Sequence, residues 1–336
     1  MKRKIYKTFS IRQNMIGKID LKDKKLLYEI DFNSRIPINQ LAKKIGLSKQ
    51  GTEYKLNNLI KKGIIKGFYP VINIPKLGYI YCRLGITFNN TTLKKEKEII
   101  NYLKNNKKFF WIFTTQGSQD VLSAIWVKSI KEFRETIIDF MNKFGKYLKL
   151  KDESITTEVI HYQHRYLLNK KETKEINIQE TNEKYTLNNK EKELLKILVE
   201  DPRIQITKLA DKMKTTPKVA AYTLKKLEKE KIIEAYRPII DHLKLGYTYH
   251  KLWINLKYEN KKQLETLYNF IKQNPLVVYV VKGVSFPEDL DIEIIVKDNF
   301  QLYNFVKELK QKFPTLIGDY KTFMFIETKK VRYLPF

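Results

Sequence analysis

The stretch NSRIPINQLAKKIGLSKQGTEYKLNNLIKKGIIKGFYPVIN, residues 33–73, carries the pattern that decides the fold. Apolar residues recur at helical spacing over 38–45, and Gly46 follows them as a glycine does after a helix C-terminus. Ser48 then offers an N-cap for a second helix, which Gly63 ends. Two helices joined by so tight a turn are typical of a helix-turn-helix.

The flanking residues complete the unit. A preceding helix is expected over 20–31, because the apolar residues from Leu26 to Ile30 share one face and charged residues cover the other. After the second helix of the motif, residues 64–71 are rich in β-formers, and we expect a short hairpin that turns at Gly67. Three helices followed by a hairpin form a winged helix-turn-helix.

The sequence of this unit is repeated 168 residues further along the chain. Residues 24–86 align with 192–254 without a gap, and about a third of the positions are identical. Two copies are too few for a solenoid. The repeat therefore predicts a covalent pseudo-dimer with internal two-fold symmetry.

After each winged unit the pattern changes to short strands and helices. The order is β-α-β-β-α-β in both copies, with the last strands expected near 155–160 and 323–326. The expected fold class is therefore α+β: a tandem repeat of a winged helix-turn-helix plus a ferredoxin-like (βαββαβ) domain. We expect the two ferredoxin-like domains to pair sheet against sheet.

These patterns also set the expected domain boundaries. Residues 169–184 are polar, charged and without a hydrophobic period, which indicates a linker or a poorly packed helix. The expected division is a basic N-terminal arm (1–17), winged helix-turn-helix 1 (18–74), ferredoxin-like domain 1 (75–166), a linker (167–185), winged helix-turn-helix 2 (186–242) and ferredoxin-like domain 2 (243–336).

Composition restricts the class of partner. A net charge of +28 over 336 residues indicates a polyanion, either nucleic acid or an acidic membrane surface. No apolar run approaches the roughly 20 residues of a membrane span, and the single cysteine, Cys82, indicates a reducing compartment. We expect a cytoplasmic, nucleoid-associated protein that binds double-stranded DNA and has no membrane partner.

The charge is uneven between the copies. Residues 1–168 hold 33 basic and 14 acidic residues, a charge of +19, and residues 169–336 hold 32 and 23, a charge of +9. An unopposed basic arm can follow phosphates or enter a minor groove, and it can equally be a solubilising tail. The basic residues of this arm are Lys2, Arg3, Lys4, Lys7 and Arg12.

The first copy resembles the Lrp/AsnC family of transcription regulators. That family has an asparagine and an arginine before L-A-x-x-x-G-x-S, then a helix ending in leucine, then G-x-I and L-G. The matching residues are Asn33, Arg35, Leu41, Ala42, Gly46, Ser48, Leu59, Gly63, Ile65, Leu77 and Gly78. The second copy is looser, because Lys214 and Lys231 stand where the family has glycine, and Thr223 where it tends to have a basic residue.

The second helix of each motif is the expected reading helix. Thr52, Leu56 and Leu59 share one face and should pack inward, so the opposite face should enter a major groove. The candidate DNA-binding residues are Ser48, Lys49, Gln50, Glu53, Tyr54, Lys55, Asn57 and Lys66 in the first copy, and Thr216, Lys218, Tyr222 and Lys225 in the second.

The two reading faces differ in chemistry. Gln50 and Asn57 each pair a donor with an acceptor, which suits adenine edges, whereas Lys218 and Lys225 only donate and suit guanine or phosphate. Glu234 replaces Lys66 in the second copy, so we expect the first copy to bind DNA more strongly. For any single residue, a solvated face without contacts stays the alternative.

The family resemblance implies that the ferredoxin-like domain serves in pairing and in sensing small molecules, often amino acids. The family's turn between the second and third strands is glycine-rich and has an aspartate before the third strand. The candidate effector-binding residues are Gly117 and Asp120, and Gly283 and Asp289, where GVSFPED lengthens the turn by three residues. A glycine in a hairpin turn is more often only a turn residue.

Nothing in the sequence indicates catalysis, a metal or a cofactor. There is no P-loop and no G-x-S-x-G, and His161 and His164, three apart in an expected strand, should point to opposite faces. Siroheme decarboxylases resemble the same family in fold and are typified by an H-N-Y-x-R stretch. The corresponding residues here, 109–128 and 277–296, contain neither histidine nor arginine.

We therefore expect a sequence-specific transcription regulator and not an enzyme. It would act as a covalent pseudo-dimer on an imperfect palindrome. Modulation by a small molecule such as an amino acid, and assembly of fused chains into a homo-oligomer, are both compatible with the sequence and stay open. An architectural, DNA-coating protein is the alternative function, because a charge of +28 also suits binding without sequence preference. A siroheme decarboxylase-like enzyme is the less favoured third.

Overall fold

The computed structural model describes residues 19–172, 174–257, 260–285 and 288–336, so the expected basic arm lies outside the described residues. Each copy begins with three helices and a strand. They are α2 (Leu21–Ile30), α3 (Ile38–Ile45), α4 (Lys49–Lys61) and β1 (Ile65–Ile72), then α7 (Asn189–Glu200), α8 (Ile206–Lys212), α9 (Pro217–Lys229) and β7 (Ile233–Ile240). We call α2–α4 head 1 and α7–α9 head 2.

The expected helix ends are confirmed. The Ser48 side chain accepts a hydrogen bond from the Gly51 N–H at 3.0 Å and begins α4. Thr216 begins α9 in the same way, with Pro217 at the first helical position. Gly46 ends α3 in the left-handed region, at φ 66°.

The expected hairpin of residues 64–71 is wrong. This segment is the single strand β1, which pairs antiparallel with β7 of the other copy, so that Ile65 faces Ile240 and Ile72 faces Ile233. Gly67 lies at an irregularity of this pairing and not at a turn. The partner strand lies 168 residues away, where the local pattern of the sequence could not show it.

The remaining elements follow the expected β-α-β-β-α-β order in each copy. Copy 1 has β2 (Ile80–Phe88), α5 (Leu93–Asn105), β3 (Phe109–Gln116), β4 (Val121–Val127), α6 (Ile130–Phe144) and β5 (Leu148–Tyr162). Copy 2 has β8 (Thr248–Leu256), α10 (Lys261–Gln273), β9 (Val277–Val284), β10 (Leu290–Val296), α11 (Asn299–Lys312) and β11 (Ile317–Val331). Short 3₁₀ turns lie at Pro75–Leu77, Gly145–Tyr147, Arg165–Leu167 and Leu243–Leu245.

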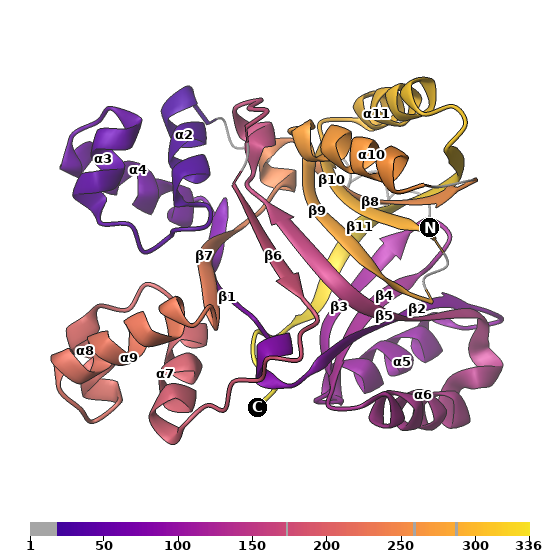
Figure 1. The fold of residues 1–336 in the computed structure, drawn as a ribbon, viewed down its shortest axis with the longest axis horizontal. Helices are drawn as coiled ribbons and strands as arrows, with labels where there is room; N and C mark the ends of the chain where they lie inside the picture. Colours follow the sequence, from indigo (N-terminus) through magenta and orange to yellow (C-terminus); the bar gives the residue numbers. More distant parts are fainter. Residues whose placement is uncertain (1–18, 173, 258–259, 286–287) are drawn as a thin grey trace.

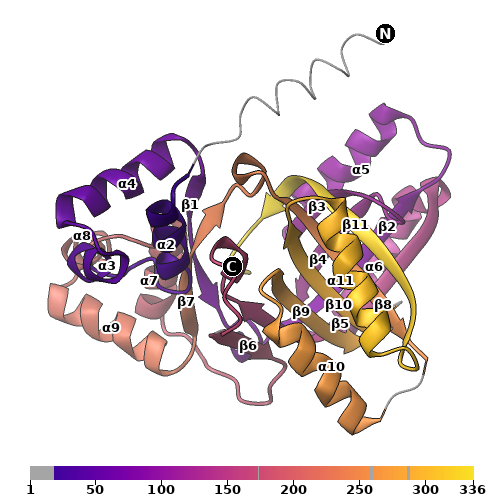
Figure 2. The same cartoon turned by 90° about the horizontal axis from the view of Figure 1, so that it is seen from above.

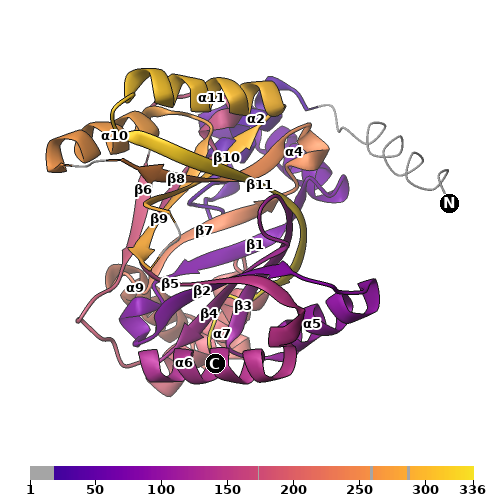
Figure 3. The same cartoon turned by 90° about the vertical axis from the view of Figure 1, so that its right-hand side faces the viewer.

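The two sheets join at their edges and do not simply pack sheet against sheet as expected. The strand order β2-β4-β3-β11-β8-β10-β9-β5 closes on itself through the pairing of β2 with β5, which makes a barrel of the described strands (Figure 3). The joints are β3 with β11 and β5 with β9, each between copies. The last strands are accordingly much longer than expected, because β5 and β11 each pair with strands of both copies.

The segment between the copies is more ordered than expected. Within 169–184, the strand β6 (Glu175–Gln179) pairs antiparallel with β5, from Glu158 opposite Gln179 to Tyr162 opposite Glu175. The expectation of a linker or a poorly packed helix is therefore wrong for Glu175–Gln179, which form a strand. Their alternation of isoleucine with polar residues, EINIQ, is the strand pattern that the surrounding charges obscured.

The elements form two regions, seen in Figure 1. The heads lie together on one side, with the β1–β7 ribbon between them and the barrel. Figure 2 gives the same arrangement from above. Helices α5 and α6 pack on the outside of one part of the barrel, and α10 and α11 on the outside of the other, over the apolar cores around Ile125 and Ile292. Among the described helices, none has the length and apolar character needed to cross a membrane.

Candidate nucleic-acid interface

Helix α4 divides into an inner and an outer face as predicted. Thr52, Leu56 and Leu59 are its buried residues, which confirms the inward face. On the opposite side Gln50, Tyr54 and Asn57 are exposed, and Tyr54 keeps 72% of its surface in solvent. A large aromatic side chain left this exposed between two amides provides a surface that can contact a groove.

Helix α9 presents the equivalent face with different side chains. Lys218, Tyr222 and Lys225 are exposed, and Tyr222 keeps 69% of its surface in solvent. Thr223 is buried in the head, and its hydroxyl donates to the Val219 carbonyl at 2.9 Å. The residue that departs from the family pattern at this position is therefore a packing residue.

Other candidate residues are already engaged within the protein. The Lys55 ammonium lies 2.7 Å from Asp20 Oδ2 and 3.0 Å from Asp23 Oδ1, and its hydrogen bond lowers the pKa of the Asp20 carboxyl. The exposed Lys66 lies 2.9 Å from Asp241 Oδ2. The candidates that remain on the surface of α4 are Lys49 and Glu53, besides the outer face described above.

The two heads are fastened to each other by arginines. Arg35 donates from Nη1 to the Pro202 carbonyl at 2.6 Å and from Nη2 to the Ile204 carbonyl at 3.1 Å. Its guanidinium also lies 5.3 Å from the ring centre of Tyr236, and Arg203 lies 5.0 Å from that of Phe68. Each head thus places an arginine on the aromatic residue of the other copy's strand, which fixes the heads on one side of the molecule (Figure 2).

The candidate effector residues have structural contacts. A side chain at Gly117, whose φ is +154°, would meet the Thr322 carbonyl of β11 at 2.5 Å. Asp120 accepts from the Phe88 N–H at 2.7 Å, and Asp289 accepts from the Leu256 N–H at 2.7 Å. Gly283 was expected in a turn, but it lies within β9 opposite Thr156. Asp120 also borders a cavity of about 490 Å³ beside Glu96.

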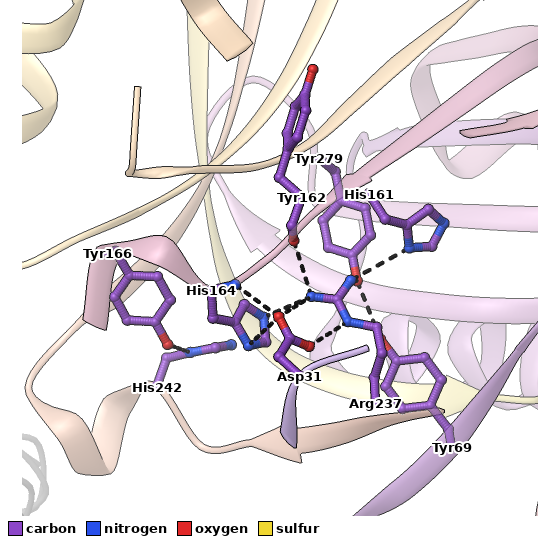
Figure 4. A network of polar contacts seen from close by, with 9 residues as sticks. All are labelled: Asp31, Tyr69, His161, Tyr162, His164, Tyr166, Arg237, His242 and Tyr279. Atoms are coloured by element: carbon purple, nitrogen blue, oxygen red, sulfur yellow. Dashed lines mark hydrogen bonds and ion pairs between the residues drawn. The ribbon is translucent and has the colours of Figure 1, made fainter. Parts of the chain in front are cut away.

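Sequence reasoning missed a buried junction between the copies, drawn in Figure 4. Asp31, at the end of α2, receives hydrogen bonds from Arg237 of β7: Nε to Oδ1 at 2.8 Å and Nη2 to Oδ2 at 3.0 Å. Both side chains are inaccessible to solvent. Burial opposes the charged form of the Asp31 carboxyl, but the charge of Arg237 and the hydrogen bonds from Arg237 and from the His164 backbone N–H hold its pKa below the ordinary value.

Two histidines complete this junction. Arg237 Nη1 lies 3.4 Å from His161 Nδ1, and Nη2 lies 3.3 Å from His164 Nε2. A guanidinium only donates, so both ring nitrogens accept and both rings are neutral. Burial lowers the pKa of His161 to about 3 and that of His164 to about 4.

The expectation that these histidines point to opposite faces is therefore wrong. Strand β5 ends at Tyr162, so His164 lies beyond the strand and turns back toward Arg237 (Figure 4). The Tyr279 hydroxyl of β9 accepts from Arg237 at 3.1 Å and lies 3.3 Å from the Tyr69 hydroxyl of β1. Within the described part of the chain, no group of His, Cys, Asp and Glu is placed to hold a metal.

The repeat makes the junction one-sided. At a shift of 168, Asp31 corresponds to Val199 and Arg237 to Tyr69. At the position equivalent to Arg237, the Tyr69 ring stacks on Tyr333 with ring centres 4.8 Å apart. The signal that could have revealed the junction is a pair of aligned positions where one copy is charged and the other is not.

A large cavity lies between the β1–β7 ribbon and the inside of the barrel. Its volume is about 700 Å³, and both copies contribute to it. Among the lining residues are ten with aromatic rings: Tyr69, Tyr81, Phe110, Trp111, Phe113, Trp126, Tyr249, Trp253, Tyr279 and Tyr333. We call this space the central cavity.

Comparisons with known proteins agree with the geometry of the heads. A family described as winged helix-turn-helix DNA-binding matches residues 19–66 and again 187–234. The HTH-type transcriptional regulator LrpA of Pyrococcus horikoshii is 30% identical over 128 residues, which cover 38% of this chain and 87% of that protein. Regulatory protein AsnC of Haemophilus influenzae is 26% identical over 143 residues, 42% of this chain and 89% of its own length.

A solved structure shares the whole architecture. The siroheme decarboxylase NirDL superposes with a TM-score of 0.60 over 93% of both chains, at 13% sequence identity, which shows a common fold and no more. The sequence relatives and the two matches to the winged helix-turn-helix family assign the chain itself. It belongs to the Lrp/AsnC family of transcription regulators, in a tandem form with two helix-turn-helix copies in one chain.

Proposed function

We propose that this chain is a sequence-specific DNA-binding regulator that acts as a covalent pseudo-dimer on an imperfect palindrome. The observation that carries the proposal is the pair of exposed reading faces on two heads fastened together by the β1–β7 ribbon and by Arg35. One face offers Gln50 and Asn57, and the other offers Lys218 and Lys225. Two such faces suit two half-sites of unequal sequence.

The chemistry of each face sets its preference. Glutamine and asparagine form paired hydrogen bonds with adenine in the major groove, whereas lysine donates to guanine or to phosphate. Half-sites for two joined helix-turn-helix heads lie about one turn of DNA apart, or a multiple of it. We expect head 1 to select adenine-containing sequence and head 2 to be less selective.

The two kinds of unit have different roles in this proposal. The helix-turn-helix units, 18–74 and 186–242, bind DNA, while the ferredoxin-like units, 75–166 and 243–336, join the copies and respond to a small molecule. Gly117, Asp120, Gly283 and Asp289 stay candidates for the effector site, although their contacts also account for them structurally. Assembly of several fused chains would place more heads along the DNA.

Selection of bound duplexes from a random pool, using the full chain, tests the proposal. The selected sites should contain two unequal half-sites at a fixed spacing. Replacing both Gln50 and Asn57 by alanine should reduce discrimination between the selected site and random duplex more than it reduces binding to random duplex. Equal weakening on every duplex would show that these residues do not read bases.

An architectural, DNA-coating role is the second candidate, because the charge of +28 favours it. Such a protein would bind random and selected duplexes alike, with affinity that falls steeply as salt rises. Binding curves on both duplexes at two salt concentrations separate the candidates. A large ratio of affinities favours the regulator.

We also propose that the chain is not a siroheme decarboxylase. The acidic side chains of siroheme require basic partners, yet Lys66, Arg83 and Lys251 at the central cavity are each bound to carboxylates, and Arg332 donates to the Lys107 carbonyl. Incubation of the full chain with siroheme should give no Soret band of a bound complex. A strong band would support the enzyme instead.

A further inference from the structure

The central cavity has a buried charged end inside the barrel. The Lys251 ammonium lies 2.9 Å from Asp291 Oδ1 and 2.8 Å from Glu293 Oε1. Arg83 lies 3.2 Å from Glu288 Oε1 and also bonds the Asp291 carboxylate. Both cations are therefore already neutralised by acidic partners.

Four carboxyls lie at this end, and burial opposes the charged form of two of them. Asp152, which accepts from the Gln119 side chain, joins the three carboxyls that surround Arg83 and Lys251. Burial, with the neighbouring Asp291 adding to it, raises the pKa of Glu288 to about 9, and burial also raises the pKa of Asp152. A bound cation would favour the charged forms of Glu288 and Asp152, whereas a bound anion would have to compete with carboxylates for Arg83 and Lys251.

Two polar side chains on the wall lack a partner. Trp253 and Thr156 are each only 4% exposed, and both line the central cavity. Neither Trp253 Nε1 nor Thr156 Oγ1 has a hydrogen-bond partner among the described residues. An unsatisfied buried N–H costs about 1–3 kcal/mol, so it suggests an acceptor atom that arrives with a ligand.

The rest of the wall suits a flat apolar body. Phe110 and Trp126 stack with ring centres 3.8 Å apart, and Trp111 lies 4.5 Å from Phe113. Aromatic faces attract cations as well as rings. A volume of about 700 Å³ lies within the range of small-molecule sites.

We propose that the central cavity binds an organic cation of the arylalkylamine class, an aromatic ring joined to an ammonium group by an alkyl chain, that also carries an acceptor oxygen. Its ring would lie against the aromatic wall, and its ammonium group would approach the carboxyls around Lys251. Its oxygen would accept from the indole N–H of Trp253. This ligand site does not depend on the proposed function.

The position of the cavity adds a consequence for the heads. Tyr69 and Ile72 of β1 and Ile239 of β7 form one wall, so a ligand would contact the ribbon that joins the two heads. Occupancy would then favour one spacing of the reading helices. This second step rests on the proposed DNA-binding function.

Calorimetry on the full chain tests the site with three probes that share a 4-hydroxyphenyl ring and differ in charge. Tyramine is a cation, tyrosine is a zwitterion, and 3-(4-hydroxyphenyl)propionate is an anion. Tyramine should bind at least about tenfold more tightly than the propionate, with tyrosine between them, because its ammonium group meets carboxyls, whereas the carboxylate of the propionate meets cations that already have acidic partners. Phenethylamine, which lacks the hydroxyl, should bind more weakly than tyramine.

Variants place the binding in the cavity. Glu293→Gln should lower the affinity for tyramine by about fivefold or more. Asp152→Asn provides the same test if the first variant does not fold. Trp253→Phe keeps an aromatic ring at this position and removes the N–H, so it should abolish the preference for tyramine over phenethylamine. Glu98→Gln, on the exposed surface of α5, is the matched control and should change nothing.

The outcomes are decisive in both directions. Equal or tighter binding of the propionate, or no binding of any probe at millimolar concentration, would overturn the proposed site. The coupling step is measured separately, as the affinity for the selected duplex with and without tyramine. An unchanged DNA affinity would overturn the coupling alone, and an absence of DNA binding would count against the proposed function and not against the cavity.

Discussion

Asp31 and Arg237 lie 206 positions apart in the chain and form a paired ion contact, 2.8 Å from Nε to Oδ1, with no side-chain surface exposed. The equivalent residues on the other side of the repeat are Val199 and Tyr69. The two copies keep the same arrangement of strands, but the side chains at these equivalent positions differ in charge. A dimer of identical chains would carry the same residues on both sides, so the one-sided junction is a property that fusion permits.

The junction predicts a clear result in denaturation. Asp31→Val leaves the Arg237 charge buried without a partner, and it should lower the free energy of unfolding by about 3–5 kcal/mol. The double variant Asp31→Val with Arg237→Tyr copies the residues of the other side. It should recover at least half of that loss, because apolar replacement of a whole buried ion pair is often neutral.

Urea unfolding of the two variants and of the parent chain measures this difference. Arg203→Ala serves as the comparison, because Arg203 contacts Phe68 of β1 in the other copy but belongs to no buried ion pair in the described structure. A double variant no more stable than Asp31→Val alone would show that the junction depends on the other contacts of Arg237.

The neutral histidines predict a loss of stability in acid. The folded-state pKa of His164 is lowered to about 4 and that of His161 to about 3, below the ordinary value of about 6.5. Their contribution is therefore complete above about pH 6.5 and is lost as the pH falls, because the unfolded chain binds protons that the folded chain does not.

At pH 5 the expected loss is about 2 kcal/mol for each histidine relative to pH 7.5. Thermal unfolding across this range measures it, and His164→Gln should show a shallower decline than the parent chain even if its stability at pH 7.5 is lower. Identical slopes for the two proteins would mean that His164 does not titrate between these pH values.

The heads could be predicted from sequence because their determinants are local. Ser48, Gly46 and the apolar spacing of α3 act within one or two helical turns, and the structure confirms each of them. The partners of the strands could not be predicted in the same way. Pairing of β1 with β7 and of β3 with β11 depends on surfaces more than 150 residues apart, and alternation within one strand does not specify its neighbour.

In the candidate site, too, the features set by local sequence could be predicted and those set by distant residues could not. The exposed faces of α4 and α9 follow from helical periodicity, so residues such as Gln50 and Lys218 were predicted with their correct exposure. The acidic partners of Lys55 lie on another helix, and sequence spacing gave no sign of them. The central cavity was also missed, because it exists only where strands of both copies close the barrel.

Head 2 holds two lysines in a conformation that favours glycine. Lys214 has φ 50° and Lys231 has φ 56°, at the positions where the first copy has Gly46 and Gly63. A side chain in the left-handed region costs about 1 kcal/mol. Lys214→Gly and Lys231→Gly should therefore each raise the free energy of unfolding, by about 0.5–1 kcal/mol.

Chemical denaturation of the two single variants checks this expectation. The reverse change, Gly46→Lys, provides the control and should destabilise the chain, because a side chain there also approaches the Lys22 ammonium at 3.0 Å. Unchanged stability in both glycine variants would mean that the lysine side chains compensate for the backbone strain.

Lys49 and Lys55 are six residues apart on α4 but should contribute unequally to DNA binding. Lys49 is exposed at the beginning of the helix, whereas Lys55 is half-buried and held by Asp20 and Asp23. An ammonium already paired with two carboxylates releases few counterions when DNA arrives. Lys49→Ala should lower the slope of log affinity against log salt by about 0.9, and Lys55→Ala should change it much less. Titration of one duplex at several salt concentrations measures both slopes, and equal losses would show that Lys55 leaves its carboxylates to contact phosphate.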